Sequence, residues 1–432
     1  MSDVKRTPEE RQLLARAAQV LPGGTLGNIR LDDDYSFMVR EGRGSRIWDV
    51  SGNEYVDYLL GSGPMVVGHA HPKVLAAAEE AMRKGTTFFT QNPYAVELAE
   101  RIVDAVPCAD QVRYTSTGTE ATSYALRVAR AYRKRDKILK FEGGFHGMHD
   151  YSLMSLSPSG TVPFPAPDPS SAGIPKAVQD TVLVAPFNDL KATAAIIEQH
   201  HNDLGAVIVE PVQRVLAPLP GFLEGLREIT ARYDIPLIFD EVVTGFRMAY
   251  GGAQQYYGVT PDLAAIGKIV GGGFPLAAVV GRKELMDVYD AKAVDAGDFV
   301  PQVGTLNGNP VAAAAGLATL EIMREPGLYE GYWERGGRLR NGLQQMLDEA
   351  EIPATVSGVD IMFDVYFTEQ EITGYRSTLG ADKAKNKVFD ETLMEHGVFK
   401  PPGKVYVGVC HDETDIEHTL AAFKAGVDAL RD

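Results

Sequence analysis

The chain has 432 residues, of which 45% are hydrophobic and 23% are charged, so it has ample material for a large buried core. Its 42 Lys and Arg residues against 58 Asp and Glu residues give a net charge of −16, which argues against nucleic acid and anionic membranes as partners. No run of about 18 apolar residues occurs, and the N-terminal stretch is charged and amphipathic. We therefore expect a cytoplasmic protein with no membrane span.

The first hundred residues predict helices around a short hairpin. A helix is expected over residues 8–20, because Leu13, Leu14, Ala17 and Val20 share one face. Strands are expected over Ser36–Val39, Ser45–Asp49 and Glu54–Leu59, the last two joined by a Gly52-Asn53 turn. Helices over Pro72–Lys84 and Tyr94–Val106 follow. The two cysteines, Cys108 and Cys410, are far apart and outside any CxxC pattern, so neither a disulfide framework nor a metal site is predicted.

The middle of the chain alternates strands with helices, which is typical of a mostly parallel sheet covered by helices. The expected strands are Gln111–Thr115, Lys137–Phe141, Thr181–Ala185, Ala206–Glu210, Pro236–Asp240, Leu263–Ile266 and Leu276–Val280. The expected helices are Ala121–Arg133, Leu190–His200 and Leu223–Tyr233.

The remaining segments predict a long loop and a smaller α+β unit. Ser155–Lys176 is rich in Pro, Ser and Gly, and such long loops are usually functional lids or disordered. Val311–Met323 begins a long helix. Strands near Asp360–Tyr366 and Lys404–Val409 and a last helix near Asp415–Leu430 complete the chain.

Two of the expected strands end in ionisable groups. One apolar run stops at Asp240-Glu241, and the next stops at Lys268, just before three consecutive glycines. Ligands of open α/β sheets bind beyond the carboxyl ends of the strands. A lysine beside a desolvated pocket acts as a nucleophile, and an acid beside it can serve a pyridinium nitrogen, which are the needs of a pyridoxal phosphate (PLP) enzyme. The alternatives are a solvated surface lysine and an Asp-Glu helix cap.

Other strand ends carry candidate binding groups. Thr117, Gly118 and Thr119 precede a helix and suit a phosphate, although a plain capping segment with Thr119 as N-cap is the alternative. Phe145, between glycines, suits a planar ring, although core packing is the commoner fate of a phenylalanine. Glu210 and Gln213 follow another strand. Glu210 is a candidate for a substrate contact and Gln213 for a cofactor contact. The alternative is a strand that simply ends at Pro211, with a solvated Gln213.

These motifs together resemble the class III aminotransferases of PLP fold type I, and within them the glutamate-1-semialdehyde 2,1-aminomutase group. The matching segments include STGTEAT, KFEGGFHG, LIFDEVVTGFRMAYGG, IGKIVGGG and GTLNGNP. The resemblance implies an α/β fold with a mostly parallel seven-stranded sheet in a large domain and a smaller α+β domain built from both termini. The implied limits are 1–60 and 311–432 for the small domain and 61–310 for the large PLP-binding domain.

The resemblance also implies roles for the matching residues. Lys268 would form the internal aldimine with PLP and carry the proton, and Asp240 would pair with the pyridine nitrogen. Phe145 and Val242 would cover the two ring faces, and Gln213 would bond the 3-oxygen of the ring. The phosphate would be held by Thr117, Gly118 and Thr119, together with Thr305 from the other subunit of a homodimer.

The chain departs from this group at the substrate end. Arg30 matches an arginine that binds a substrate carboxylate, although three neighbouring aspartates make a surface charge an equal alternative. Ser62 stands where the group has a tryptophan, and Tyr406 stands where the group has a glutamate and ω-amino acid transaminases have an arginine that pairs with the glutamate matching Glu210. A wider, more apolar site follows from these changes. We therefore expect a transaminase acting between a keto acid and a β-amino acid, bulky amine or aryl amino acid. The alternatives are the aminomutase, a racemase or epimerase, and a non-catalytic PLP-binding protein.

Overall fold

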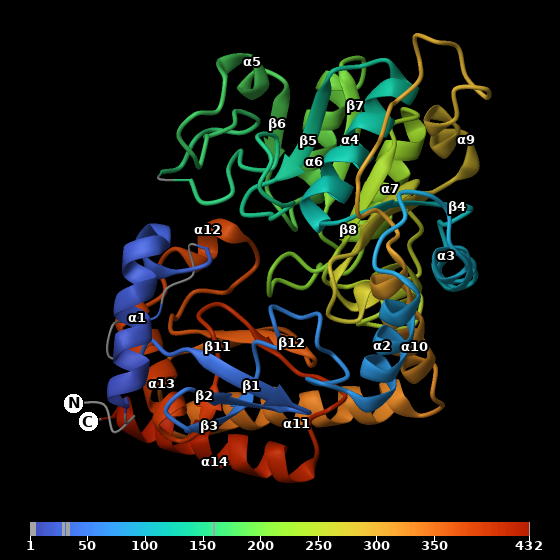
Figure 1. Ribbon diagram of the computed structural model, residues 1–432. Helices are drawn as coiled ribbons and strands as arrows, with labels where there is room; N and C mark the ends of the chain where they lie inside the picture. Colours follow the sequence, from blue (N-terminus) through green and yellow to red (C-terminus); the bar gives the residue numbers. More distant parts are fainter. Residues whose placement is uncertain (1–5, 28–30, 32–34, 159, 432) are drawn as a thin grey trace. The chain divides into compact units, whose positions relative to one another are not determined.

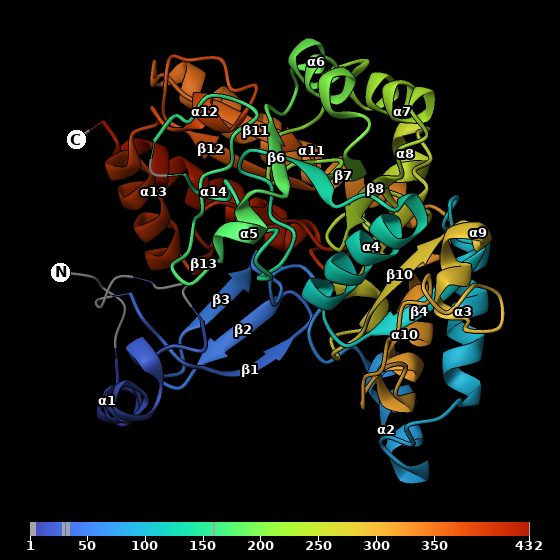
Figure 2. The same cartoon turned by 90° about the horizontal axis from the view of Figure 1, so that it is seen from above.

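The computed structural model describes residues 6–27, 31, 35–158 and 160–431 (Figures 1 and 2). The chain packs as two compact units. The larger comprises Pro72–Tyr329 and Glu371–Gly380, and the smaller comprises Met1–His71, Glu330–Gln370 and Ala381–Asp432. These limits differ from residues 60 and 310 because α2 (Pro72–Lys84) and α10 (Pro310–Met323) pack against each other within the larger unit.

A seven-stranded sheet forms the centre of the larger unit, in the order β4-β10-β9-β8-β7-β5-β6. The strands are β4 (Gln111–Thr115), β5 (Lys137–Phe141), β6 (Val182–Ala185), β7 (Leu204–Val209), β8 (Leu237–Glu241), β9 (Leu263–Ile266) and β10 (Ala277–Gly281). β10 pairs antiparallel with both of its neighbours, β4 and β9, and the other neighbouring strands of this sheet pair parallel. The predicted fold class is confirmed, and the predicted strands lie within two residues of the observed ones.

Helices cover both faces of this sheet (Figure 2). On one face, α4 (Gly118–Arg133) packs on alternate strand residues such as Ile208 and Val279. On the other face, Phe141 of β5 makes edge contacts with Phe222 at the start of α7 (Phe222–Arg232). Both faces of the strands are buried, and because successive side chains of a strand point to opposite faces, alternate residues pack against opposite helix layers. The remaining α-helices of this unit are α3 (Pro93–Ala105), α5 (Lys176–Gln179), α6 (Leu190–His200), α8 (Gly252–Tyr257), α9 (Lys283–Met286) and α12 (Tyr375–Thr378).

The carboxyl ends of the parallel strands meet at one edge of the sheet. On β8 and β9, Asp240 pairs with Ala265 and Glu241 with Ile266, so Lys268 follows just past the neighbouring strand end. The antiparallel β10 begins at this edge, because its Ala277 pairs with Thr115, the last residue of β4. The predicted ligand-bearing strand ends therefore share one edge.

The smaller unit contains two short sheets. One has the order β1-β2-β3-β13 and the other the order β11-β12-β14. Its strands are β1 (Val39–Arg43), β2 (Arg46–Asp49), β3 (Glu54–Asp57), β11 (Thr355–Val359), β12 (Met362–Tyr366), β13 (Val398–Phe399) and β14 (Val405–Tyr406). Its helices are α1 (Pro8–Val20), α11 (Leu328–Glu349), α13 (Lys383–Glu395) and α14 (Glu413–Ala429).

Several predictions about the smaller unit need correction: β13, α11 and α13 were not predicted, and the strand predicted near Lys404–Val409 covers only Val405–Tyr406. The strand predicted at Ser36–Val39 begins only at Val39, because it pairs antiparallel with β2 from that residue onward. The strand β11 was not predicted, yet it forms a hairpin with β12 that pairs Val359 with Met362. The β2–β3 hairpin around Gly52 is confirmed.

The Pro-rich segment between β5 and β6 is irregular, as predicted, apart from a bridge between Met154 and Pro169 and the short helix α5 (Lys176–Gln179) at its end. Within the described residues, none of the helices is long and apolar enough to cross a membrane.

Candidate functional site

The residues predicted as a phosphate cradle, Thr117, Gly118 and Thr119, lie at the N-terminus of α4. Thr117, not Thr119, is its N-cap, and its side-chain oxygen accepts from the backbone N–H of Glu120 at 3.1 Å. The Glu120 carboxylate in turn accepts from the backbone N–H groups of Ser116 and Thr117, both at 2.9 Å. This capping box fixes the turn that enters the helix, whose N-terminal end favours an anion.

Val242 connects the cradle to the lysine turn. A Cβ built on Gly118 would lie 2.9 Å from Cγ1 of Val242, and one built on Gly267 would lie 3.4 Å from the same atom. Gly118 begins α4, Gly267 precedes Lys268, and Val242 follows β8. The structure therefore brings the phosphate cradle, the Asp240 strand end and the lysine turn together around one valine.

Lys268 lies in an unusual backbone conformation. Its φ is 52°, in the left-handed region that costs a residue other than glycine about 1 kcal/mol or more. The turn after Lys268 packs against α10. Gly316 of α10 lies so close to the carbonyl of Val270 that a Cβ at position 316 would not fit. Lys268 is half-buried.

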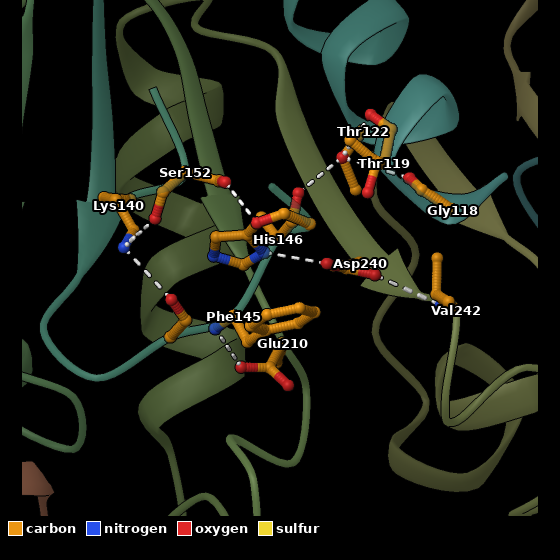
Figure 3. A network of polar contacts seen from close by, with 12 residues as sticks. Gly118, Thr119, Thr122, Lys140, Phe145, His146, Ser152, Glu210, Asp240 and Val242 are labelled. Carbon is orange, nitrogen blue, oxygen red and sulfur yellow. Dashed lines mark hydrogen bonds and ion pairs between the residues drawn. The ribbon is translucent and has the colours of Figure 1, made fainter. Parts of the chain in front are cut away.

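Asp240 is buried at the end of β8 and contacts a histidine (Figure 3). Nδ1 of His146 lies 2.8 Å from Oδ2 of Asp240, and the backbone N–H of Val242 donates to Oδ1 at 3.1 Å. Burial, and then the charge of Lys140, lower the pKa of His146 to about 3. The imidazole is therefore neutral near pH 7, and Nδ1 carries the proton that it donates to Asp240.

The backbone of Phe145 is fixed by a hydrogen bond to Glu210. Its N–H donates to Oε2 of Glu210 at 2.8 Å, while the residue as a whole is 37% exposed and is not part of the core. The guanidinium of Arg214 lies 5.4 Å from the ring centroid. Glu210 is buried, so it serves here as an anchor for the Phe145 backbone.

Gln213 is buried rather than solvated. Its Nε2 donates to the carbonyl of Glu142 at 2.8 Å. The Glu142 carboxylate forms a two-pronged ion pair with Arg376, with distances of 2.7 and 2.9 Å. Contact of Gln213 with the 3-oxygen of a cofactor ring remains a prediction.

The other predicted residues belong to other segments of the chain. Thr305 is exposed in the turn before α10, and Asn307 of the same turn accepts from the Ser116 hydroxyl at 3.3 Å. Ser62, with φ of 68°, and the buried Tyr406 of β14 belong to the smaller unit. Arg30 lies outside the described residues.

The residues at this edge fit a PLP group. An added Cβ at position 118 would lie 2.9 Å from Cγ1 of Val242, so glycine lets Val242 pack against the start of α4, and this end of a helix favours an anion such as a phosphate. Two buried acceptors, Nε2 of His146 and Oε1 of Gln213, have no hydrogen-bond partner within the part of the chain that the structure describes. Such atoms are expected beside a bound polar group. The oriented Asp240 carboxylate suits a pyridinium nitrogen.

Comparison with known proteins identifies the family. The model of the class III aminotransferases matches residues 30–411. The chain belongs to the class III aminotransferase family. A glutamate-1-semialdehyde 2,1-aminomutase of Methanothermobacter thermautotrophicus is 41% identical over 98% of this chain and 100% of its own length.

Two solved structures have the same fold. An omega-transaminase from Sphaerobacter thermophilus is 36% identical with a TM-score of 0.94, covering 100% of both chains. A transaminase with PLP bound is 31% identical with a TM-score of 0.90, covering 99% of both chains. The enzyme is thus a PLP-dependent member of this family.

Sequence reasoning did not single out three residues around the site. His146 was visible in the Gly-Phe-His-Gly motif but received no role. Lys140 interrupts an apolar strand, which is a signal because a charged residue is rarely buried without partners. Glu142 gives no such signal, because its partner Arg376 is 234 residues away.

Proposed function

We propose that this enzyme transfers an amino group on PLP at the carboxyl edge of the larger unit's sheet. The observation that carries the proposal is the packing of Val242 between Gly118 and Gly267, beside the Asp240 strand end. It draws an anion cradle, a buried acid and a lysine turn into one place.

Each side chain then has a role in the proposal. Thr117, Gly118 and Thr119 hold the phosphate, and Phe145 and Val242 cover the ring faces. Asp240, oriented by His146, holds the proton of the pyridine nitrogen. When bound, PLP supplies an electron sink for charge that develops on the substrate carbon. Lys268 binds the cofactor and moves the proton at that carbon through Nζ.

We also propose a homodimer. Thr305 is exposed in its own chain, and the proposal has it contact the phosphate held by the other subunit. The partners are otherwise small amines and keto acids.

The first candidate reaction is the conversion of glutamate-1-semialdehyde into 5-aminolevulinate. It is supported by the name of the relative that is 41% identical over 98% of this chain. In this reaction the amino group returns to the same carbon skeleton, so no external keto acid takes part.

The second candidate is transfer between a β-amino acid, bulky amine or aryl amino acid and a keto acid. It is favoured by Ser62 and Tyr406, which replace the tryptophan and glutamate expected from the aminomutase pattern. The 36% identical omega-transaminase supports it as well. Binding of a substrate carboxylate by Arg30 belongs to either candidate.

A substrate comparison with purified holoenzyme separates these reactions. Glutamate-1-semialdehyde is supplied alone, and a panel of amine donors is supplied with pyruvate or 2-oxoglutarate. Rapid formation of 5-aminolevulinate without transfer to external keto acids supports the first candidate, and the reverse pattern supports the second. Deuterium exchange without keto-acid formation points to a racemase. A cofactor absorbance band that no amine changes would overturn the proposal of amino transfer.

A further inference from the structure

Lys140 occupies a position built for an apolar residue. It lies on β5 directly beside Val184 of β6, and its neighbour two residues earlier, Ile138, belongs to the core under α4. The Lys140 side chain is fully buried. A buried ammonium is costly unless every N–H finds an acceptor, so its contacts are expected to matter.

Three backbone carbonyls accept hydrogen bonds from the Lys140 ammonium, among them that of Ser152 (Figure 3). Nζ donates to the carbonyls of Gly144 at 3.0 Å, Ser152 at 2.9 Å and Met154 at 2.5 Å. An ammonium has three N–H groups, whereas a neutral amine has two and would direct its lone pair at a carbonyl. Burial lowers the pKa of Lys140 to about 7, and the nearby Glu210 and Glu142 carboxylates act in the opposite direction.

The segment that Lys140 holds is the one that lines the site. Gly144 precedes Phe145, whose N–H donates to Glu210, and His146, whose Nδ1 donates to Asp240. The Ser152 hydroxyl donates to the carbonyl of Gly147, and this bond links the end of the segment to Ser152. The Lys140 side chain thus binds residues at both ends of the loop over residues 144–154, which follows β5.

We propose that Lys140 is a positioning residue, whose ammonium holds the Gly144–His146 segment so that Phe145 and His146 keep their places beside the cofactor. Lys140 touches neither Phe145 nor His146 through its side-chain hydrogen bonds, which go to Gly144, Ser152 and Met154. Its effect therefore passes through the backbone. The proposal rests on the PLP site proposed above.

The matched test compares Lys140→Met with Lys137→Met. Lys137 lies on the same strand, but its ammonium forms an ion pair with Asp203 at the surface. Lys140→Met keeps an unbranched side chain that is one heavy atom shorter, and it removes all three N–H donors. Lys140→Arg restores charged donors, and Lys140→Gln supplies two neutral ones in case the Met variant does not fold.

The first measurement is hydrogen exchange of the apoenzyme, which does not depend on cofactor or turnover. In the Lys140→Met or Lys140→Gln variant, amides of residues 144–154 are expected to exchange at least about tenfold faster, with α4 and the rest of the sheet unchanged. Unchanged exchange in residues 144–154 would overturn the proposal. Uniformly faster exchange across the sheet would also overturn it, because it would show that Lys140 supports only the core.

The second measurement is made on the holoenzyme. We expect the visible circular dichroism of bound PLP to change and turnover to fall by roughly 10²-fold, since misplacement of about 1 Å has effects of this size. Lys140→Arg should recover part of both, and Lys137→Met should match the wild type. A normal dichroism spectrum in the Lys140 variants would contradict the proposal. Failure of the wild type itself to bind PLP would refute the proposed function and leave the exchange result standing.

Discussion

The imidazole of His146 donates through Nδ1 to the carboxylate of Asp240 at 2.8 Å, and both side chains are buried. The backbone N–H of Val242 donates to the other oxygen of the same carboxylate. Asp240 is therefore fixed in orientation from two sides. A fixed negative charge beside a pyridinium nitrogen costs no reorganisation when charge moves during the reaction.

Removing that charge should abolish most of the turnover. For Asp240→Asn we expect turnover to fall by on the order of 10²–10³-fold, because the amide carries no charge for the cofactor nitrogen. Asp203→Asn is the control, because the Asp203 carboxylate is exposed and forms an ion pair with Lys137. Steady-state kinetics that find both variants equally impaired would contradict the assignment.

The neutral state of His146 predicts a pH dependence of stability. In the folded protein the pKa of His146 is lowered to about 3, mainly by burial, and that of His149 likewise. Below about pH 6.5 these two histidines are protonated in the unfolded chain but stay neutral in the folded chain. The free energy of unfolding therefore falls as the pH falls towards 3. Each histidine contributes a slope of about 1.4 kcal/mol per pH unit.

Urea unfolding of the apoenzyme between pH 7 and pH 5 measures this slope. For His146→Asn we expect the free energy of unfolding to depend less steeply on pH, by the contribution of one proton, because Asn does not titrate. A slope equal to that of the wild type would mean that His146 is protonated in the folded state.

Gly118 predicts the effect of one added methyl group on cofactor binding. Its φ is not positive, so Ala is tolerated by the backbone, but the new Cβ would lie 2.9 Å from Val242. We expect Gly118→Ala to weaken PLP binding by roughly tenfold or more, since Val242 or the start of α4 must shift. Gly297→Ala is the control, because nothing lies within 4 Å of its added Cβ. Equal dissociation constants for the two variants in a fluorescence titration would contradict the placement of the cradle.

Arg376 holds the Pro-rich loop to the site. Its guanidinium pairs with the buried Glu142, donates to the carbonyl of Val162 at 2.6 Å and lies 4.1 Å from the Phe164 ring centroid. Arg376→Ala leaves a buried carboxylate without this partner, at a cost of about 1–3 kcal/mol.

Limited proteolysis and urea unfolding test this contact. We expect faster cleavage within residues 155–176 of Arg376→Ala and an intermediate rate for Arg376→Lys, which keeps the charge but loses the two-pronged geometry. Cleavage of this loop at the wild-type rate would show that Arg376 does not restrain it.

The sheet was predictable because its signals are local. The predicted strands Lys137–Phe141, in which three of the five residues are apolar, and Leu263–Ile266 match β5 and β9 residue for residue. Each is short, flanked by turns and buried on both faces, so the pattern needs no distant partner. Ser36–Val39 lacks such a constraint, because the start of β1 is set by its pairing with β2.

The site was predictable only where a residue belongs to a strand end. Asp240 and Lys268 follow apolar runs, so topology alone places them at one edge. The contacts that orient them depend on long-range packing, as in the bond of His146 to Asp240 and the pair of Glu142 and Arg376. Lys140 was predictable only in part. A lysine within a largely apolar strand is visible in the sequence, but the carbonyls that it binds are not.

The central claim is that Lys268 binds PLP covalently and moves the substrate proton. The decisive measurement is the absorbance spectrum of the Lys268→Ala holoenzyme, taken before and after addition of an amine substrate and followed by single-turnover kinetics. We expect retained PLP, loss of the lysine–cofactor band and a fall in turnover of at least about 10³-fold, because both the covalent link and the base are removed. A wild-type spectrum with substantial turnover in this variant would contradict the account.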